Sequence, residues 1–143
     1  MIIYLDTSAL LKQYIQETGS DEVVKLLTSV DSSGTNLLTH VEMASAIARA
    51  VRMELVFANE AQSTWKDFLA DWELLVRLDI SVQITKRAAT LAWEHGLRGY
   101  DAMHLASALS WQEAIDTPVT LATYDRELWA AALKAGMEVW PEK

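Results

Sequence analysis

Four acidic residues of this 143-residue chain stand where apolar runs end or helical stretches begin. Asp6 and Asp125 each follow a short apolar run, whereas Glu42 and Asp101 stand near the start of a helical stretch. In an open parallel sheet these junctions share one edge, so residues far apart in the sequence can converge on one cleft. The sequence therefore predicts a cluster of four carboxylates.

Such a cluster indicates a metal site and hydrolytic chemistry. Crowded carboxylates repel one another, which raises their pKa values unless a cation neutralises them. Mg²⁺ and Mn²⁺ prefer oxygen ligands, and water bound to such an ion can attack phosphorus. The chain has no cysteine, which excludes thiolate ligands. We therefore expect Asp6, Glu42, Asp101 and Asp125 to bind Mg²⁺ or Mn²⁺ and to hydrolyse a phosphodiester.

Each acid also has a simpler explanation. Asp101 and Asp125 can act as helix N-terminal residues, each contributing about 1 kcal/mol, and Glu42 can be a solvated glutamate. Asp6 fits this explanation least, because it follows an apolar strand, where an unpaired buried charge is costly. The coincidence of all four at one sheet edge favours the metal site.

The elements that must position these residues alternate along the chain. Strands are predicted at 2–5, 36–39, 80–84, 119–123 and 137–140, and helices at 8–17, 21–30, 41–55, 59–77, 85–95, 101–114 and 126–135. Strands that alternate with helices predict an α/β fold, because parallel neighbours need a crossover helix. We expect a single domain over 1–143, with three α/β/α layers and a short, mainly parallel sheet of about five strands.

Charge and hydropathy bear on partners and location. The formal net charge of −8 argues against a polyanionic partner, because such binding depends on Lys and Arg. A cation at the cluster would neutralise part of this charge, and the remaining negative surface suits a basic protein partner. No apolar run approaches about 18 residues, so we expect a cytoplasmic protein without a membrane partner.

Four segments around the acids resemble the motifs of the PIN-domain family. They are YLDTSAL at 4–10, HVEMASA at 40–46, LRGYDAMHLA at 97–106 and LATYDREL at 121–128, in that order. Within this family the chain resembles the VapC toxins of type II toxin–antitoxin pairs, both in length and in its Asp-Ala-x-His-Leu-Ala segment. The resemblance covers nearly the whole chain and implies a PIN-like fold.

The resemblance also implies an activity and roles for residues. It implies an endoribonuclease dependent on Mg²⁺ or Mn²⁺, with an RNA substrate and a cognate antitoxin as partners. The catalytic residues carried over from the family motifs are Asp6, Glu42, Asp101 and Asp125, with Thr123 orienting a water or a carboxylate, and Thr7 and Ser8 as neighbours.

Basic residues near the motifs are candidates for contacts with RNA. Arg49 and Arg98 are expected to guide phosphates together with Ser8, and Arg49 returns to nearly the same helical face as Glu42. Lys12 and Arg126 are further candidates, although isolated basic residues usually stay solvated. His104 stands three residues after Asp101 and is expected to be a hydrogen-bonded structural residue.

The tryptophans of the stretch 59–77 have a structural explanation. Trp65 and Trp72 lie on an apolar helical face together with Phe68 and Leu69, which predicts core packing or a protein interface rather than base stacking. Trp140 is expected to be packed as well. This apolar face, with the negative charge, leads us to expect a homodimer that also captures an antitoxin.

Two other functions compete with the ribonuclease. One is a haloacid-dehalogenase-like phosphatase or phosphoacceptor domain that would use Asp6 as the phosphate acceptor. Such phosphatases usually carry a second aspartate two positions later, where this chain has Ser8. The other is a catalytically silent PIN-like binding module. Because all four acids are present, the sequence gives no reason to invoke lost activity.

Overall fold

A five-stranded sheet forms the centre of the computed structural model, which describes residues 1–142. The strands lie in the order β3-β2-β1-β4-β5, and every pairing within these residues is parallel. They are β1 (Ile2–Leu5), β2 (Ser32–Asn36), β3 (Val76–Leu78), β4 (Val119–Ala122) and β5 (Glu138–Trp140). The predicted α/β fold with a short sheet of about five strands is confirmed. Lys143, the last residue of the expected single domain, lies outside the described residues.

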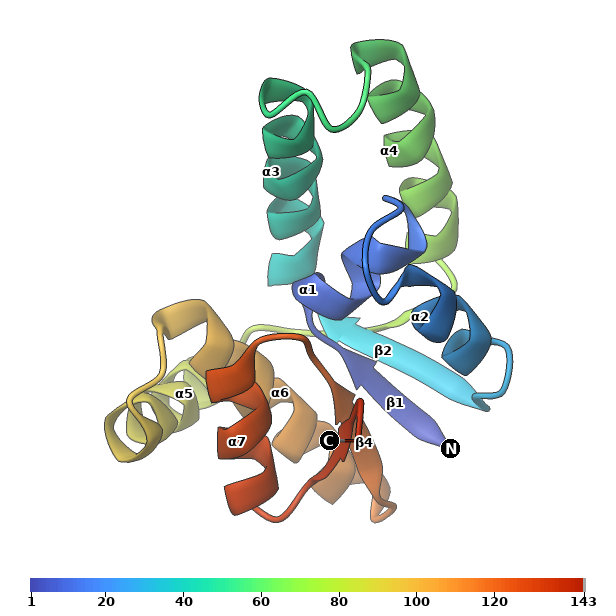
Figure 1. Ribbon diagram of the computed structural model, residues 1–143. Helices are drawn as coiled ribbons and strands as arrows, with labels where there is room; N and C mark the ends of the chain where they lie inside the picture. The colour runs from blue at the N-terminus through green and yellow to red at the C-terminus, as the bar shows by residue number, and fades with distance from the viewer. Residues whose placement is uncertain (143) are drawn as a thin grey trace.

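Helices cover both faces of the sheet. They are α1 (Thr7–Leu10) with a 3-10 turn at Leu11–Gln13, α2 (Ser20–Leu27), α3 (Leu38–Arg52), α4 (Ala58–Trp72), α5 (Val82–His95), α6 (Gly99–Ile115) and α7 (Arg126–Lys134). In Figure 1, α5, α6 and α7 lie on one side of the sheet, α1 and α2 lie on the other, and α3 and α4 stand out as a pair. Among residues 1–142, no helix is both long enough and apolar enough to span a bilayer.

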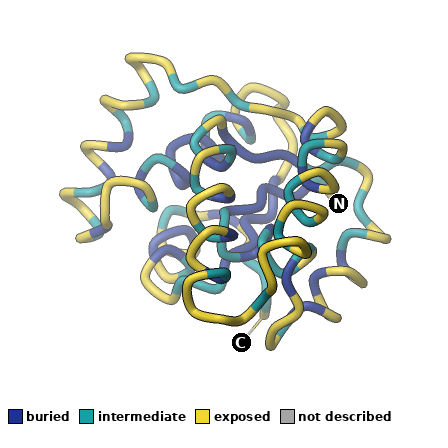
Figure 2. Tube along the Cα trace, turned by 90° about the horizontal axis from the view of Figure 1, so that it is seen from above, coloured by how far each residue is buried: buried dark blue, intermediate teal, exposed yellow. Residues whose placement is uncertain are grey.

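The alternation of side chains along β1 divides the core in two. Ile3 and Leu5 point into a cluster formed with α1 to α4, whereas Tyr4 points into a second cluster formed with α5, α6 and α7. All three side chains are completely buried. Figure 2 shows the buried segments gathered at the centre, with exposed segments around them. The central strand is therefore fixed from both faces, and so is the residue that follows it.

The second strand lies earlier than the predicted range 36–39. Its sequence, Ser-Ser-Gly-Thr-Asn, is poor in strand formers, and the pairing of β2 with both β1 and β3 overrides that low propensity. Gly34 is needed there, because a Cβ at this position would lie 2.9 Å from the Trp111 ring. Because the pairing with neighbouring strands specifies β2, its own sequence gives little indication of a strand. The predicted range was therefore wrong.

The third strand and the helices around it also differ from the prediction. The helix predicted over 59–77 ends at Trp72, β3 follows at Val76–Leu78, and α5 begins at Val82. The alternation at 80–84 was misleading, because Ser81 is a helix cap whose hydroxyl accepts the Ile84 N–H at 3.1 Å. The predicted strand 80–84 is therefore the entry into a helix.

Two helix boundaries affect the candidate site. The helix predicted over 8–17 stops at Leu10 and continues only as the short 3-10 turn. Helix α3 begins at Leu38 rather than at 41, because the Asn36 side chain accepts the Leu38 N–H at 3.1 Å. The predicted start at 41 would put Glu42 in the first turn of its helix. With the observed start at Leu38, Glu42 lies in the second turn.

The aromatic stripe of α4 faces the protein's own core. Phe68 is completely buried and Trp72 nearly so. The Trp72 ring contacts His40 at 5.1 Å, and Phe68 contacts Tyr14 edge-on at 5.7 Å between ring centroids. The core-packing interpretation of this stripe is confirmed, so the stripe no longer supports a protein interface.

Candidate active site

The carboxyl ends of β1 and β4 place Asp6 beside Thr123. Leu5 pairs with Ala122, so the next residue of each strand leaves the sheet at the same level. The Asp6 N–H donates to the Ala122 carbonyl at 3.2 Å, and the Thr123 hydroxyl donates to Asp6 Oδ2 at 2.6 Å. The parallel register thus brings together two residues that are 117 positions apart.

Asp6 is buried and held by hydrogen bonds at both carboxylate oxygens. Its exposed fraction is 3%. Besides the bond from Thr123 to Oδ2, its Oδ1 caps α1 by accepting the Ala9 N–H at 3.0 Å and also accepts the Ser8 hydroxyl at 2.7 Å. Burial raises the pKa of Asp6, although these bonds and nearby His104 act to lower it. The carboxylate is thus precisely oriented but poorly solvated, an arrangement that a cation would stabilise.

Glu42 reaches the same region from α3. Its Oε1 accepts the Thr7 hydroxyl at 2.9 Å and bonds His104 Nε2 at 2.7 Å. Burial acts to raise the pKa of Glu42, but the hydrogen bond and charge of His104, with the Thr7 hydroxyl, outweigh it and lower the pKa. His104 is itself buried, and its Nδ1 bonds the Tyr4 hydroxyl at 2.7 Å. The predicted structural histidine is confirmed, and its partner is one of the four acids.

Asp101 and Asp125 share one guanidinium group. Arg98 Nε donates to Asp101 Oδ2 at 3.2 Å, and its Nη2 donates to Asp125 Oδ2 at 2.7 Å. Asp125 also caps α7, since its Oδ1 accepts the Leu128 N–H at 2.9 Å. The capping explanation therefore holds for one oxygen of Asp125 and leaves the other for a cation.

The four acids divide into a group of three, Asp6, Asp101 and Asp125, and a separate Glu42. Burial raises the pKa of Asp101, and the charges of Asp125 and Asp6 raise it further, against the opposing effect of Arg98. The Glu42 carboxylate is hydrogen-bonded to His104 instead. Within residues 1–142, no three histidine or acidic side chains converge closely enough to ligate one ion as they stand. Each carboxylate instead binds hydroxyl, N–H or guanidinium groups of the chain.

The chemistry of this donor set still fits a hard cation. The donors are carboxylate oxygens with adjacent hydroxyls, the groups that Mg²⁺ and Mn²⁺ prefer. The raised pKa values of Asp6 and Asp101 indicate negative charge that the chain compensates incompletely. Among residues 1–142, the positive group that contacts both Asp101 and Asp125 is the 73% exposed side chain of Arg98. A divalent ion bound there would have to compete with that side chain.

The other predicted residues lie at different distances from this group. Ser8 is part of it, because its hydroxyl donates to Asp6 and accepts the Tyr124 N–H at 2.9 Å. Arg49 is not brought to it, and its Nε donates to Met53 Sδ at 3.4 Å on the exposed side of α3. Lys12 forms an ion pair with Glu17 at 3.0 Å, and its Nζ lies 4.3 Å from the centre of the Tyr124 ring.

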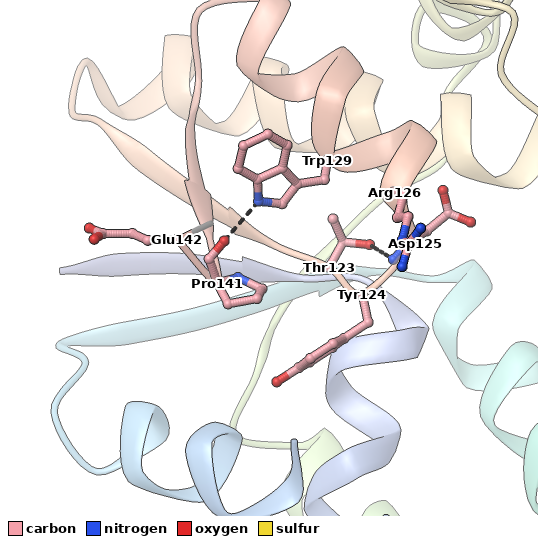
Figure 3. Close-up of a pocket in the computed structure, with 7 residues that line it drawn as sticks. All are labelled: Thr123, Tyr124, Asp125, Arg126, Trp129, Pro141 and Glu142. Atoms are coloured by element: carbon pink, nitrogen blue, oxygen red, sulfur yellow. Dashed lines mark hydrogen bonds between the residues drawn. The ribbon is translucent and has the colours of Figure 1, made fainter. Parts of the chain in front are cut away.

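Sequence reasoning missed a hollow beside these residues. It has a volume of about 390 Å³ and is drawn in Figure 3. Its walls come from the turn after β4, from α7 and from the segment after β5, and they consist of Thr123, Tyr124, Asp125, Arg126, Trp129, Pro141 and Glu142. Trp140, expected to be packed, meets Tyr124 edge-on at 5.8 Å between ring centroids. The only sequence signal for the hollow was the aromatic residue between Thr123 and Asp125.

Comparisons with known proteins bear on the family and the fold of the chain. Residues 3–134 match the PIN domain family. The chain is 34% identical over 143 residues to Ribonuclease VapC45 of Mycobacterium tuberculosis, covering 98% of this chain and 95% of the relative. Ribonuclease VapC46 of that species is 33% identical over 140 residues, covering 96% and 95%. The solved VapBC2 from Rickettsia felis, bound to a promoter DNA fragment, has a TM-score of 0.67 at 16% identity, covering 99% and 100%, which is a likeness of fold.

Proposed function

The chain belongs to the PIN domain family, and on that premise we propose that it is a metal-dependent endoribonuclease, the toxin of a toxin–antitoxin pair. Relatives named as ribonucleases match nearly its whole length at 34% identity. The observation that carries the proposal is the linkage of three acids at the carboxyl edge of the sheet. The Thr123 hydroxyl donates to Asp6 and accepts the Asp125 N–H, and Arg98 donates to both Asp125 and Asp101. Carboxylates linked in this way at a ligand-binding edge, with Asp6 buried, suit metal-assisted hydrolysis better than helix capping alone.

The metal site would consist of Asp6, Glu42, Asp101 and Asp125. We propose Mg²⁺ or Mn²⁺ because the donors are oxygens. When bound, such an ion supplies charge neutralisation at the phosphate and a more acidic water as nucleophile.

Neighbouring side chains hold these ligands in place. Thr123 and Ser8 donate to opposite oxygens of Asp6, which fixes the plane of its carboxylate. Thr123 also accepts the Asp125 N–H at 3.0 Å, which links two of the acids through one hydroxyl. His104 and Thr7 both bond Glu42 Oε1, which fixes the position of that one oxygen. Ligands oriented before substrate arrives need less reorganisation during the reaction.

Arg98 is proposed to guide the RNA backbone. A guanidinium matches phosphate geometry through paired N–H donors, and this one already lies between Asp101 and Asp125. Release of the two carboxylates to the ion would free it to bind the phosphate, with Ser8 at the same edge. Arg49 lies about two turns beyond Glu42 on α3 and suits a more distant phosphate.

A cognate antitoxin is the proposed protein partner. Similar solved structures include a toxin–antitoxin complex from Klebsiella pneumoniae. The net charge of −8 suits a basic partner at the cleft. Exposed apolar side chains for docking stand between α3 and α4, where Leu55 is 67% and Phe57 is 75% exposed. We also propose a homodimer, which size-exclusion chromatography with light scattering would detect.

The geometry disfavours the phosphatase alternative. A phosphoacceptor aspartate must present one free oxygen to phosphorus. Here Asp6 is 3% exposed, and both of its oxygens accept hydrogen bonds. A ligand role, which keeps the carboxylate in place, fits this environment better than a nucleophilic role.

The test is to map the ends of RNA cleaved by the purified chain. We expect internal cleavage of single-stranded RNA with Mn²⁺ or Mg²⁺, loss of cleavage in EDTA, and products with 5′-phosphate and 3′-hydroxyl ends. Glu42→Gln should abolish cleavage, whereas Glu60→Gln, an exposed acid on α4, should not. Undiminished cleavage in EDTA, or 2′,3′-cyclic phosphate products, would refute the mechanism.

A further inference from the structure

The hollow in Figure 3 is continuous with the proposed active site. Two of its lining residues, Thr123 and Asp125, also belong to the acidic site. Its volume of about 390 Å³ falls within the range of about 300–1,000 Å³ that is usual for small-molecule sites. An occupant of the hollow would therefore lie beside Thr123 and Asp125 of the proposed active site.

The walls of the hollow are aromatic and held in position. In Figure 3 the Trp129 indole lies on one side and the Tyr124 ring on the other, with Pro141 between them at the edge. The indole Nε1 donates to the Pro141 carbonyl at 2.8 Å, and the Tyr124 hydroxyl donates to the Gly19 carbonyl at 3.3 Å. Because the polar ends of both rings are tied to backbone, binding needs little ordering of these side chains.

Charged side chains stand at both ends of the hollow, but only those at one end face the proposed active site. The Asp125 carboxylate and Arg126 stand at the active-site end, whereas the Glu142 carboxylate points away from the other side chains in Figure 3. A flat, apolar ligand with polar edges, joined to a phosphate, matches this arrangement. Unpaired nucleobases are such ligands, and proteins bind them by stacking on Tyr, Trp and Arg.

We propose that this hollow binds one unpaired nucleobase of the RNA, adjacent to the phosphate that is cleaved. The inference rests on the proposed ribonuclease function and adds a substrate subsite to it. A base in a duplex cannot leave its partner to enter the hollow without unpairing. The subsite therefore explains why cleavage should be directed to single strands.

The test uses an RNA oligonucleotide spanning a mapped cleavage site, and two derivatives with an abasic nucleotide on either side of that site. For the wild type, kcat/KM should fall about tenfold on one of the two abasic oligonucleotides, since stacking contributes about 1–3 kcal/mol per base. Trp129→Leu and Tyr124→Leu should each lose about tenfold on the intact oligonucleotide, with little further loss on that abasic one. The two losses would then be non-additive, as expected for direct contact.

Controls separate stacking from folding and from protein docking. Partial unfolding lowers all rates equally and leaves the abasic effect intact. Trp93→Leu, on α5 and 91% exposed, should retain the full effect. The subsite is refuted if the wild type shows no abasic effect on either side, or if that effect persists in both hollow variants. Unchanged cleavage by Trp129→Leu with lost antitoxin capture would refute it in favour of protein docking. If the wild type cleaves no RNA with Mn²⁺, the proposed function fails and the subsite fails with it.

Discussion

Asp6→Asn removes a buried charge while keeping most of its hydrogen bonds. Asparagine caps a helix about as well as aspartate, and its oxygen can still accept from Ala9 and Ser8. Its amide nitrogen would face the Thr123 hydroxyl and could donate to it, reversing that bond. Because burial raises the pKa of Asp6, the ionised wild-type side chain is unfavourable in the folded protein.

The expected changes differ with and without metal. Without metal, the free energy of unfolding of Asp6→Asn should be unchanged or higher by up to about 1 kcal/mol, a rise in Tm of up to about 3 °C. Asp6→Ala, the matched control, should lose about 1 kcal/mol for the cap and about 1–3 kcal/mol for the stranded Thr123 hydroxyl. With Mn²⁺ at one hundred times its Kd, the wild type should gain about 2.7 kcal/mol, and Asp6→Asn should gain less. Its cleavage should fall at least about a hundredfold, or about 2.7 kcal/mol of barrier.

The pH dependence gives an independent check on this reasoning. A carboxyl whose pKa is raised on folding binds more protons in the folded state, so stability falls as pH rises above the unfolded value of about 3.9. The advantage of Asp6→Asn should therefore be small near pH 3 and reach its full size above the raised pKa. Glu42, whose pKa is lowered, has the opposite dependence but is present in both proteins, so its effect cancels. Thermal melts from pH 3 to above the raised pKa, with and without Mn²⁺, measure the stability of both proteins. An RNase assay measures their cleavage. A clear drop in metal-free Tm with near-normal cleavage would refute the assignment of Asp6.

Substitutions at three other residues test the cluster and its surroundings. Arg98→Gln removes the cation that competes with the metal, so Mn²⁺ should bind a few-fold more tightly by calorimetry while KM for RNA rises; weaker Mn²⁺ binding would contradict this. His104→Leu removes one hydrogen-bond partner of the buried Tyr4 hydroxyl and releases Glu42, so urea melts should show a loss of about 1 kcal/mol and kcat should fall more than KM rises. Asp125→Ala should lose about 1 kcal/mol for its cap, whereas Asp125→Asn should keep that stability and still lose cleavage. Equal cleavage by the wild type and Asp125→Asn would reduce Asp125 to a cap.

The sequence was informative where local and tertiary signals agree. The run 2–5 is both apolar and central in the sheet, so the strand and the position of Asp6 could be predicted together. The cap at Asp125 was predictable for a similar reason. By contrast, β2 is a strand only because its neighbours pair with it, and Ser81 gave a false strand pattern by capping α5. Tertiary pairing overrides propensity at such positions.

The details of the site depend on contacts that sequence does not encode locally. The bond between His104 and Glu42 spans 62 positions, and the guanidinium of Arg98 reaches Asp125 across 27. The hollow depends on the hydrogen bond between the Trp129 indole and the Pro141 carbonyl. That bond in turn requires β5 to pair with β4. The sequence could predict the four acids and their positions at strand ends and helix starts. Their side-chain partners depend on the register of the sheet and on the packing of α3 against it.

The central claim is that the four carboxylates act as one metal site, and Mn²⁺ binding measured by calorimetry tests it most directly. Asp6→Asn, Glu42→Gln, Asp101→Asn and Asp125→Asn should each weaken Mn²⁺ binding about tenfold or more, or about 1.4 kcal/mol. Glu60→Gln removes the same charge from an exposed position on α4 and should bind Mn²⁺ as the wild type does. If two or more of the four variants bind Mn²⁺ as tightly as Glu60→Gln, the four carboxylates do not form one metal site.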